Sequence, residues 1–118
     1  FSSKNITCSV QLPDSPVIIK MNGTLATILV TNLIKNAFVH SPEGGKVILA
    51  LTETQLVVEN SGDSPLDSSR IFDRFFQGSK KEGSTGLGLA LAKTIADRNG
   101  MQLTYSYMNG MHRFCVKF

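Results

Sequence analysis

The sequence predicts an α+β fold: a two-layer α/β sandwich whose mixed, mainly antiparallel sheet is covered on one face by about three helices. Three observations carry this prediction. Runs with a strand-like pattern occur in pairs, helical segments lie between the pairs, and the elements follow the order β-β-α-β-β-α-α-β-β. A chain of 118 residues and 12.8 kDa is expected to form one domain, residues 1–118, around a single hydrophobic core.

Six segments have the composition or the alternation of β-strands. In the first, apolar residues alternate with polar ones as in a half-buried strand: Ile6, Cys8, Val10 and Leu12. The others are the β-branched run PVIIKM, the pair GGKVILALTE and TQLVVEN, and two strands within MQLTYSYMNGMHRFCVKF. Asn109-Gly110 suits the type I′ turn of a hairpin, so the last two strands are predicted to pair.

Helices are expected over residues of about 24–39, 67–76 and 86–98. Gly100 follows the last of them, where a glycine in the left-handed conformation commonly ends a helix. In the short middle segment, the aromatic residues Phe72, Phe75 and Phe76 are interpreted as core anchors for a loop. The stretch at residues 77–85 is rich in Gly, Ser and Lys and is predicted to be mobile.

Composition narrows the classes of function. The formal net charge is +3 and the basic residues are scattered, which disfavours nucleic acid as a partner. No apolar run approaches the roughly 20 residues that cross a bilayer. Because the chain begins at Phe1 without an initiator methionine, we expect a fragment of a longer protein. Cys8 and Cys115 form no CxxC pair and are expected to be small buried hydrophobes in a reducing compartment.

Two asparagines interrupt the apolar side of the first predicted helix. Asn32 and Asn36 lie one turn apart within a stripe that is otherwise aliphatic: Leu25, Ile28, Leu29 and Leu33. A buried amide without a partner costs about 1–3 kcal/mol, so each must find one. A single asparagine would be expected to bond to neighbouring backbone. The pair, ahead of a glycine-rich segment, favours a polar ligand or a hydrated cation.

Three glycines precede the last predicted helix in the segment EGSTGLGLALAK: Gly83, Gly86 and Gly88. Each glycine in a helix interior costs roughly 1 kcal/mol relative to alanine, so their position requires a compensating reason. Free N–H groups at a helix start bind phosphate, and glycine lets a ligand approach the backbone closely. The segment is therefore a candidate phosphate site, with Lys80 and Lys81 nearby as possible anion contacts.

A third polar feature lies where the strand LVVEN ends. Asn60 occupies the strand end, and Gly62 follows it at a turn that would let a ligand come close. On its own this signal is weak, because N-S-G is also simply a good turn sequence.

Taken in order, the segments NLIKNA, ENSG, IFDRFF and GSTGLGLALAK resemble the N, G1, F and G2 boxes of the ATP-binding catalytic domain of sensor histidine kinases. That family belongs to a larger group with gyrase, mismatch-repair and chaperone ATPases, which share a Bergerat-type ATP-binding fold. The resemblance covers roughly residues 6–118. A P-loop is excluded because no GxxxxGK[ST] occurs, and the glycines do not follow a first strand as in dinucleotide folds.

The resemblance implies a role for each motif residue. Asn36 matches the asparagine that coordinates Mg²⁺ at the phosphates, and Asn32 matches the one a turn earlier that supports the site, so both are candidate catalytic residues. Asn60 matches the position that binds the adenine amino group, with Gly62 beside it. Arg74 matches a basic position near the phosphates in some members. The remaining ATP-binding candidates belong to the second glycine box, which closes a lid over the triphosphate: Thr85, Gly86, Leu87 and Gly88.

The chain departs from the family pattern at two positions. Asn60 stands where members usually have aspartate, so the adenine amine would meet a neutral acceptor. Val39 stands where a lysine usually contacts phosphate, and Lys35 or the lid lysines are the available substitutes. His40 takes a position often filled by Tyr or His near the nucleotide, or it is simply a helix-end residue.

The resemblance also implies the reaction and the partners. The domain would bind ATP or ADP with Mg²⁺ and donate the γ-phosphate to a histidine on a separate dimerisation domain of the same parent protein. The phosphate would then pass to an aspartate on a response regulator, in a two-component system. Neither His40 nor His112 has the acidic helical context of an acceptor. The parent is expected to be a homodimer, and the domain a soluble cytoplasmic module whose parent can be membrane-anchored.

Two alternatives remain open within the same fold. One is a stand-alone serine kinase of the anti-sigma type, or an ATPase, although a water-activating glutamate would then be expected where Asn32 stands. The other is a degenerate nucleotide-binding or scaffolding module, which Asn60 and Val39 keep open.

Overall fold

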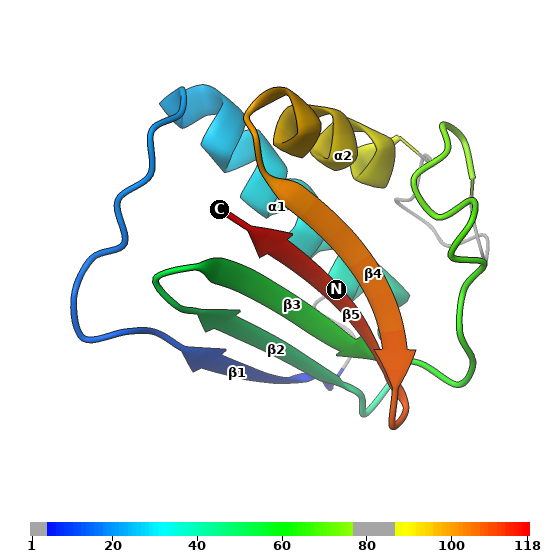
Figure 1. Cartoon of the computed structure of the whole chain (residues 1–118). Coiled ribbons are helices and arrows are strands. Elements are labelled where there is room, and N and C mark those ends of the chain that lie inside the picture. The colour runs from blue at the N-terminus through cyan, green and yellow to red at the C-terminus, as the bar shows by residue number, and fades with distance from the viewer. Residues whose placement is uncertain (1–4, 77–86) are drawn as a thin grey trace.

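A computed structural model describes residues 5–76 and 87–118 (Figure 1). A sheet forms one layer, and two helices form the other on one face of it, which confirms the predicted α+β sandwich. The elements in chain order are β1 (Thr7–Gln11), α1 (Gly23–His40), β2 (Lys46–Leu51), β3 (Gln55–Ser61), α2 (Gly88–Arg98), β4 (Gln102–Met108) and β5 (Met111–Lys117). No helix among the described residues is long and apolar enough to cross a membrane.

The sheet has five strands in the order β1-β2-β3-β5-β4. β1 pairs with β2 in parallel, and the other three pairings are antiparallel, so the sheet is mixed and mainly antiparallel as predicted. The register places Asn60 of β3 between Val47 of β2 and His112 of β5. Directly paired residues point to the same face of a sheet, so these three side chains share one face.

The first helix begins at a capped end. Asn22 accepts hydrogen bonds from the backbone N–H groups of Thr24 and Leu25, at 2.8 and 3.1 Å. Its core-facing residues are Leu29, Leu33, Ala37 and Val39. Leu25 is 36% exposed, so the apolar stripe begins later than the sequence predicts and continues to the end of the helix.

Two glycine turns are confirmed at the predicted positions. Gly100 follows α2 with φ of 70°, and Met101 N–H donates to the carbonyl of Ala96 at 2.9 Å, which closes the helix. Asn109 and Gly110 have φ of 53° and 76°, as a type I′ turn requires, and they join β4 to β5.

The run PVIIKM forms no strand, so the prediction of a second strand there is wrong. Val17, Ile19 and Met21 are partly buried while Ile18 and Lys20 are exposed, which is the alternation of an extended chain. Alternation alone does not make a strand: residues 12–22 pair with no strand in the described part of the chain.

The short helix expected at residues 67–76 is also absent, so two helices rather than three cover the described sheet. Backbone bonds link Arg70 to Asp67 and Asp73 to Arg70, each as N–H to carbonyl across three residues, giving successive turns. Phe75 has φ of 64°, a left-handed conformation that an α-helix cannot contain.

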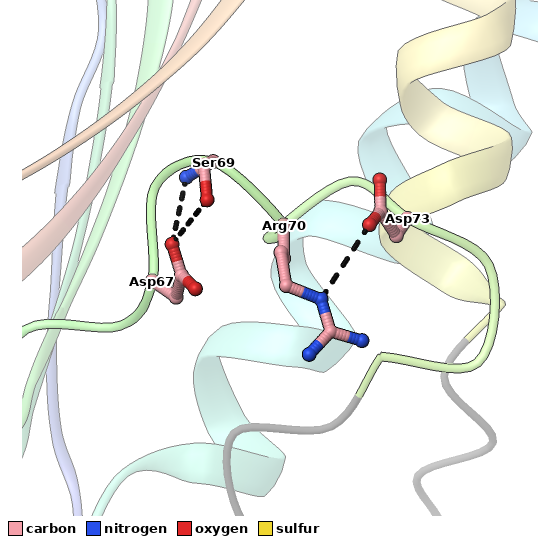
Figure 2. A network of polar contacts seen from close by, with 4 residues as sticks. All are labelled: Asp67, Ser69, Arg70 and Asp73. Carbon is pink, nitrogen blue, oxygen red and sulfur yellow. Dashed lines mark hydrogen bonds and ion pairs between the residues drawn. The ribbon is translucent and has the colours of Figure 1, made fainter.

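Side chains hold these turns from within (Figure 2). The carboxylate of Asp67 accepts from the backbone N–H and the hydroxyl of Ser69 at 3.0 and 2.6 Å, and these bonds lower the pKa of Asp67. Arg70 and Asp73 form an exposed ion pair of 3.7 Å. The segment is thus shaped by local polar contacts rather than by helix propensity.

The aromatic residues of this segment divide between core and surface. Phe72 packs edge-on against Phe114 at 6.2 Å between ring centroids, and Phe76 is partly buried against the core, as expected of anchors. Phe75 is 66% exposed, so its prediction as a core anchor is wrong. Ile71, which is buried, fixes the segment to the core instead.

The edge strand β1 is exposed along its whole length, contrary to the half-buried strand predicted. Cys8 is exposed as well, whereas Cys115 is buried as expected. Val10 and Leu12 border an apolar cavity of about 320 Å³ rather than a closed core. An edge strand has a neighbouring strand on one side only. Alternation of apolar and polar residues in its sequence therefore does not ensure that its apolar side chains are buried.

Candidate functional site

The two motif segments that the sequence places far apart meet at Asn32 and Gly88. Asn32 on α1 donates its side-chain N–H to the carbonyl of Ile28 at 2.9 Å. Its side-chain oxygen lies beside Gly88, the first residue of α2: a Cβ on Gly88 would lie 2.9 Å from it. The glycine therefore allows close contact between the two helices at the start of α2.

Asn36 lies one turn further along α1 and is partly buried. Its side chain makes no hydrogen bond with any described residue. Neutral amide oxygens are hard ligands of the kind that Mg²⁺ accepts alongside phosphates and water. The described residues hold no group of three His, Cys, Asp or Glu that could bind a metal alone. A single amide ligand thus fits an ion that arrives with a nucleotide.

Asn60 is only 1% exposed, at the end of β3. Its side-chain N–H donates to the carbonyl oxygen of Ser61 at 3.1 Å. Among the described residues, no group donates to its side-chain oxygen. The bond to Ser61 therefore orients the amide so that the oxygen is the available group.

Gly62 is held by three neighbours from the β4–β5 hairpin. Its N–H donates to the carbonyl of Gly110 at 3.0 Å, and its carbonyl accepts from the hydroxyl of Tyr107 at 2.8 Å. The imidazole of His112 fills the space that a Cβ on Gly62 would occupy. The sequence predicts that a ligand approaches Gly62 closely. On this side of the glycine, the structure instead places the ring of His112.

Three residues that surround this turn were not among the site candidates predicted from the sequence. Tyr105, Tyr107 and His112 pack together on the helix-facing side of β4 and β5, with centroid distances of 5.9 and 5.1 Å from each tyrosine to the histidine. Burial lowers the pKa of His112 and raises that of Tyr105. The signal was available: tyrosines two apart in LTYSYM must face the same side, and the Asn109-Gly110 turn sets His112 opposite Tyr107.

The N-terminus of α2 is suited to an anion. The residue at its N-cap position, Leu87, makes no side-chain cap hydrogen bond, and the first turn of the helix contains no acidic residue. Leu87, at the N-cap position, is 39% exposed. A helix start carries partial positive charge and N–H groups that can bind phosphate.

The remaining candidates are scattered or lie outside the described residues. Arg74 is exposed, with its guanidinium 5.5 Å from the ring centre of Phe75, and it makes no ion pair with any described residue. Val39 is 4% exposed and belongs to the core, and His40 is partly buried at the end of α1. The lid at residues 77–85 lies outside the described residues, as do these candidates: Lys80, Lys81, Gly83, Thr85 and Gly86.

Comparison with known proteins gives the family. A family model described as histidine kinase-, DNA gyrase B-, and HSP90-like ATPase matches residues 21–118. The sensor histidine kinase WalK of Bacillus subtilis is 35% identical over 101 residues, covering 75% of this chain and 16% of that protein. A probable sensor histidine kinase, TcrY of Mycobacterium tuberculosis, is 32% identical over 119 residues, covering 92% of this chain and 25% of that protein. The chain therefore spans a quarter or less of the length of these relatives.

Solved structures show the same fold. The catalytic domain of the histidine kinase ThkA superposes with a TM-score of 0.82 at 21% identity, covering 97% of this chain and 78% of that one. The mycobacterial sensor histidine kinase MprB gives 0.80 at 23% identity, covering 96% and 82%. The chain thus belongs to the family of histidine kinase-, DNA gyrase B- and HSP90-like ATPases, and within that family it is an ATP-binding catalytic domain of the histidine kinase type.

Proposed function

We propose that this domain binds Mg-ATP and donates the γ-phosphate to a histidine on a separate dimerisation domain of its parent protein. The parent would be a homodimeric sensor kinase of a two-component system, and a response regulator would receive the phosphate next. The observation that carries the proposal is the contact between Asn32 and Gly88, because it joins the asparagine motif of α1 to the glycine-rich start of α2. ATP and response regulators both occur in the cytoplasm, so we assign the domain to that side of the membrane.

The chain's own residues supply recognition of both ends of the nucleotide. The side-chain oxygen of Asn60 is an acceptor suited to the amino group of adenine. The start of α2, whose first turn contains no acidic residue, is suited to phosphate oxygens, with Leu87 and Gly88 at that end. Asn36, whose amide has no partner among the described residues, would hold Mg²⁺. When bound, the ion neutralises charge on the phosphate oxygens during transfer.

The state of the two histidines supports an acceptor on another domain. His112 is buried at 8% exposure, and its Nδ1 is bonded to the hydroxyl of Tyr105 at 2.8 Å. His40 is partly buried at the last position of α1. A histidine that receives a phosphate must present a ring nitrogen to the nucleotide in line with the leaving group, so neither position suits an acceptor.

Two successive measurements test the proposal: nucleotide binding first, and phosphate transfer second. Calorimetry with Mg-ADP should show binding to the 118-residue chain, and no heat at millimolar nucleotide would favour the degenerate module. The chain incubated with γ-labelled ATP should carry no acid-labile phosphate. Adding the dimerisation domain of the same parent should give label on that domain's histidine. Label on the chain alone, or none on the supplied domain despite nucleotide binding, would contradict the assignment as a histidine kinase.

A further inference from the structure

The turn that follows β3 is clamped at both ends by residues of the β4–β5 hairpin. At its start, Gly62 accepts from the hydroxyl of Tyr107 at 2.8 Å. At its end, the N–H of Leu66 donates to the hydroxyl oxygen of Tyr105 at 2.9 Å. Between the two tyrosines lies His112, stacked on Tyr105 at an interplanar angle of 28° and tilted at 54° to Tyr107. We call these three residues the tyrosine–histidine cluster.

The contacts of the cluster are compatible with a neutral His112. The hydroxyl oxygen of Tyr105 accepts from Leu66 N–H, and its own hydrogen can be donated to Nδ1 of His112, 2.8 Å away. The imidazole is then neutral, with its proton on Nε2. That arrangement agrees with the burial of the ring, which disfavours its charged form.

The cluster is connected to Asn60 through one peptide group. Nδ2 of Asn60 donates to the carbonyl of Ser61, and that carbonyl belongs to the peptide between Ser61 and Gly62. The position of this peptide depends on Gly62, against which the His112 ring packs too closely to leave room for a Cβ. A shift of Gly62 would therefore move the Ser61 carbonyl and rotate the side-chain oxygen of Asn60.

We propose that Tyr105 and His112 are positioning residues for adenine recognition: they fix the turn after Asn60 and thereby aim its side-chain oxygen at the amino group of the base. This inference rests on the proposed function, because it assumes that the nucleotide base binds at Asn60. It assigns a role in base selectivity to residues of the C-terminal hairpin, which would reach the nucleotide only through the turn.

Three variants separate the hydrogen bonds of the cluster from its bulk. Tyr105→Phe removes one hydroxyl and keeps the ring. His112→Leu removes the bond to Tyr105 and keeps an apolar side chain beneath Gly62. His112→Asn places an amide near the position of Nδ1 and can restore the bond. The matched control is Val116→Ala, on the same strand as His112. Val116 is fully buried, so removing its two methyl groups destabilises the core and leaves the contacts of the turn after β3 in place.

Competition titrations of Mg-ATP and Mg-GTP against each protein give the readout. We expect Tyr105→Phe and His112→Leu to weaken Mg-ATP binding about tenfold and Mg-GTP binding much less, so that the preference for adenine shrinks. His112→Asn should recover most of the preference. Val116→Ala should lower the melting temperature and leave the preference unchanged.

The outcomes distinguish a failure of the proposed function from a failure of the positioning role of Tyr105 and His112. If the wild-type chain binds no Mg-ATP, the proposed function fails and this inference with it. If the wild type binds with a preference for adenine that Tyr105→Phe leaves intact, the inference alone is overturned. A loss of preference in Val116→Ala equal to that in Tyr105→Phe would also overturn it, because the effect would then follow stability rather than the turn. Should His112→Leu fail to fold, Tyr105→Phe still decides.

Discussion

The side-chain oxygen of Asn32 lies 2.9 Å from the position that a Cβ on Gly88 would occupy. Asn32 on α1 and Gly88, the first residue of α2, are therefore in close contact. Real Cβ atoms are essentially never found so near another atom. The side chain of Asn32 cannot withdraw freely, because its N–H is bonded to the carbonyl of Ile28.

Gly88→Ala is therefore expected to destabilise the domain by about 1–3 kcal/mol, the usual cost of overpacking a close contact. Gly23→Ala is the matched control: Gly23 is also the first residue of a helix, but nothing lies within 4 Å of its Cβ position. That variant should be neutral or slightly stabilising, since alanine loses less chain entropy on folding. Urea unfolding curves give both free energies, and equal effects would show that the contact is not limiting.

Asn36→Ala should remove most of the dependence of nucleotide binding on Mg²⁺. The amide oxygen would contact a charged group, and losing such a contact costs about 1.5–3 kcal/mol, or roughly ten- to a hundredfold in affinity. Calorimetry with ADP, in Mg²⁺ and in a chelator, measures the dependence directly. Thr31→Ala is the control, because Thr31 is an exposed residue of the same helix to which no role in nucleotide binding is assigned. If Asn36→Ala binds Mg-ADP as the wild type does, Asn36 is not the metal ligand.

How far the sequence predicts this structure depends on whether a signal is local. The glycine after α2, the Asn109-Gly110 turn and the two long helices follow from the preferences of a few adjacent residues, and the structure confirms them. The run PVIIKM has the alternation of a strand but no neighbouring strand, and a strand exists only by pairing. The prediction for β1 is wrong for a different reason. This strand pairs with β2, but it lies at the edge of the sheet and its apolar side chains stay exposed.

The candidate site also combines features that a local sequence signal predicts with features that depend on distant parts of the chain. Asn32, Asn36 and Asn60 could be singled out because a polar residue in an apolar pattern is a local anomaly. The reasons for the two glycines could not be found in the same way. Gly62 lies against His112, fifty residues later in the chain, and Gly88 lies against Asn32 on another helix. Both contacts are set by strand register and helix packing, which no short window of sequence contains.

His112 makes the stability of the domain dependent on pH. Burial lowers its pKa in the folded state below the ordinary value of 6.5, so the unfolded chain binds the proton first as the pH falls. Stability should be full above pH 6.5 and should decrease as the pH falls below it, with a slope of at most one proton. Urea unfolding between pH 5 and 8 of the wild type and of His112→Asn measures this contribution, because His40 is present in both. An identical slope in the two proteins would exclude His112 as its source.

Asn60→Asp would restore the residue that members of the family usually carry, yet the structure predicts a cost. The N–H of Asn60 that donates to the Ser61 carbonyl at 3.1 Å would be replaced by an oxygen, which leaves two acceptors facing each other. The side chain is also 1% exposed, so a new charge would be buried there. We expect the variant without nucleotide to lose about 1–3 kcal/mol of stability at pH 7.

With nucleotide the balance changes, because a charged acceptor bonds more strongly to the adenine amine than a neutral one does, by about 1 kcal/mol. Mg-ADP should therefore raise the melting temperature of Asn60→Asp more than that of the wild type, although the variant starts lower. Thermal unfolding with and without Mg-ADP compares the two shifts. Asn99→Asp is the control for adding a carboxylate, since Asn99 donates to the carbonyl of Ile95 at the far end of α2. Equal shifts in the wild type and Asn60→Asp would mean that this side chain does not contact the base.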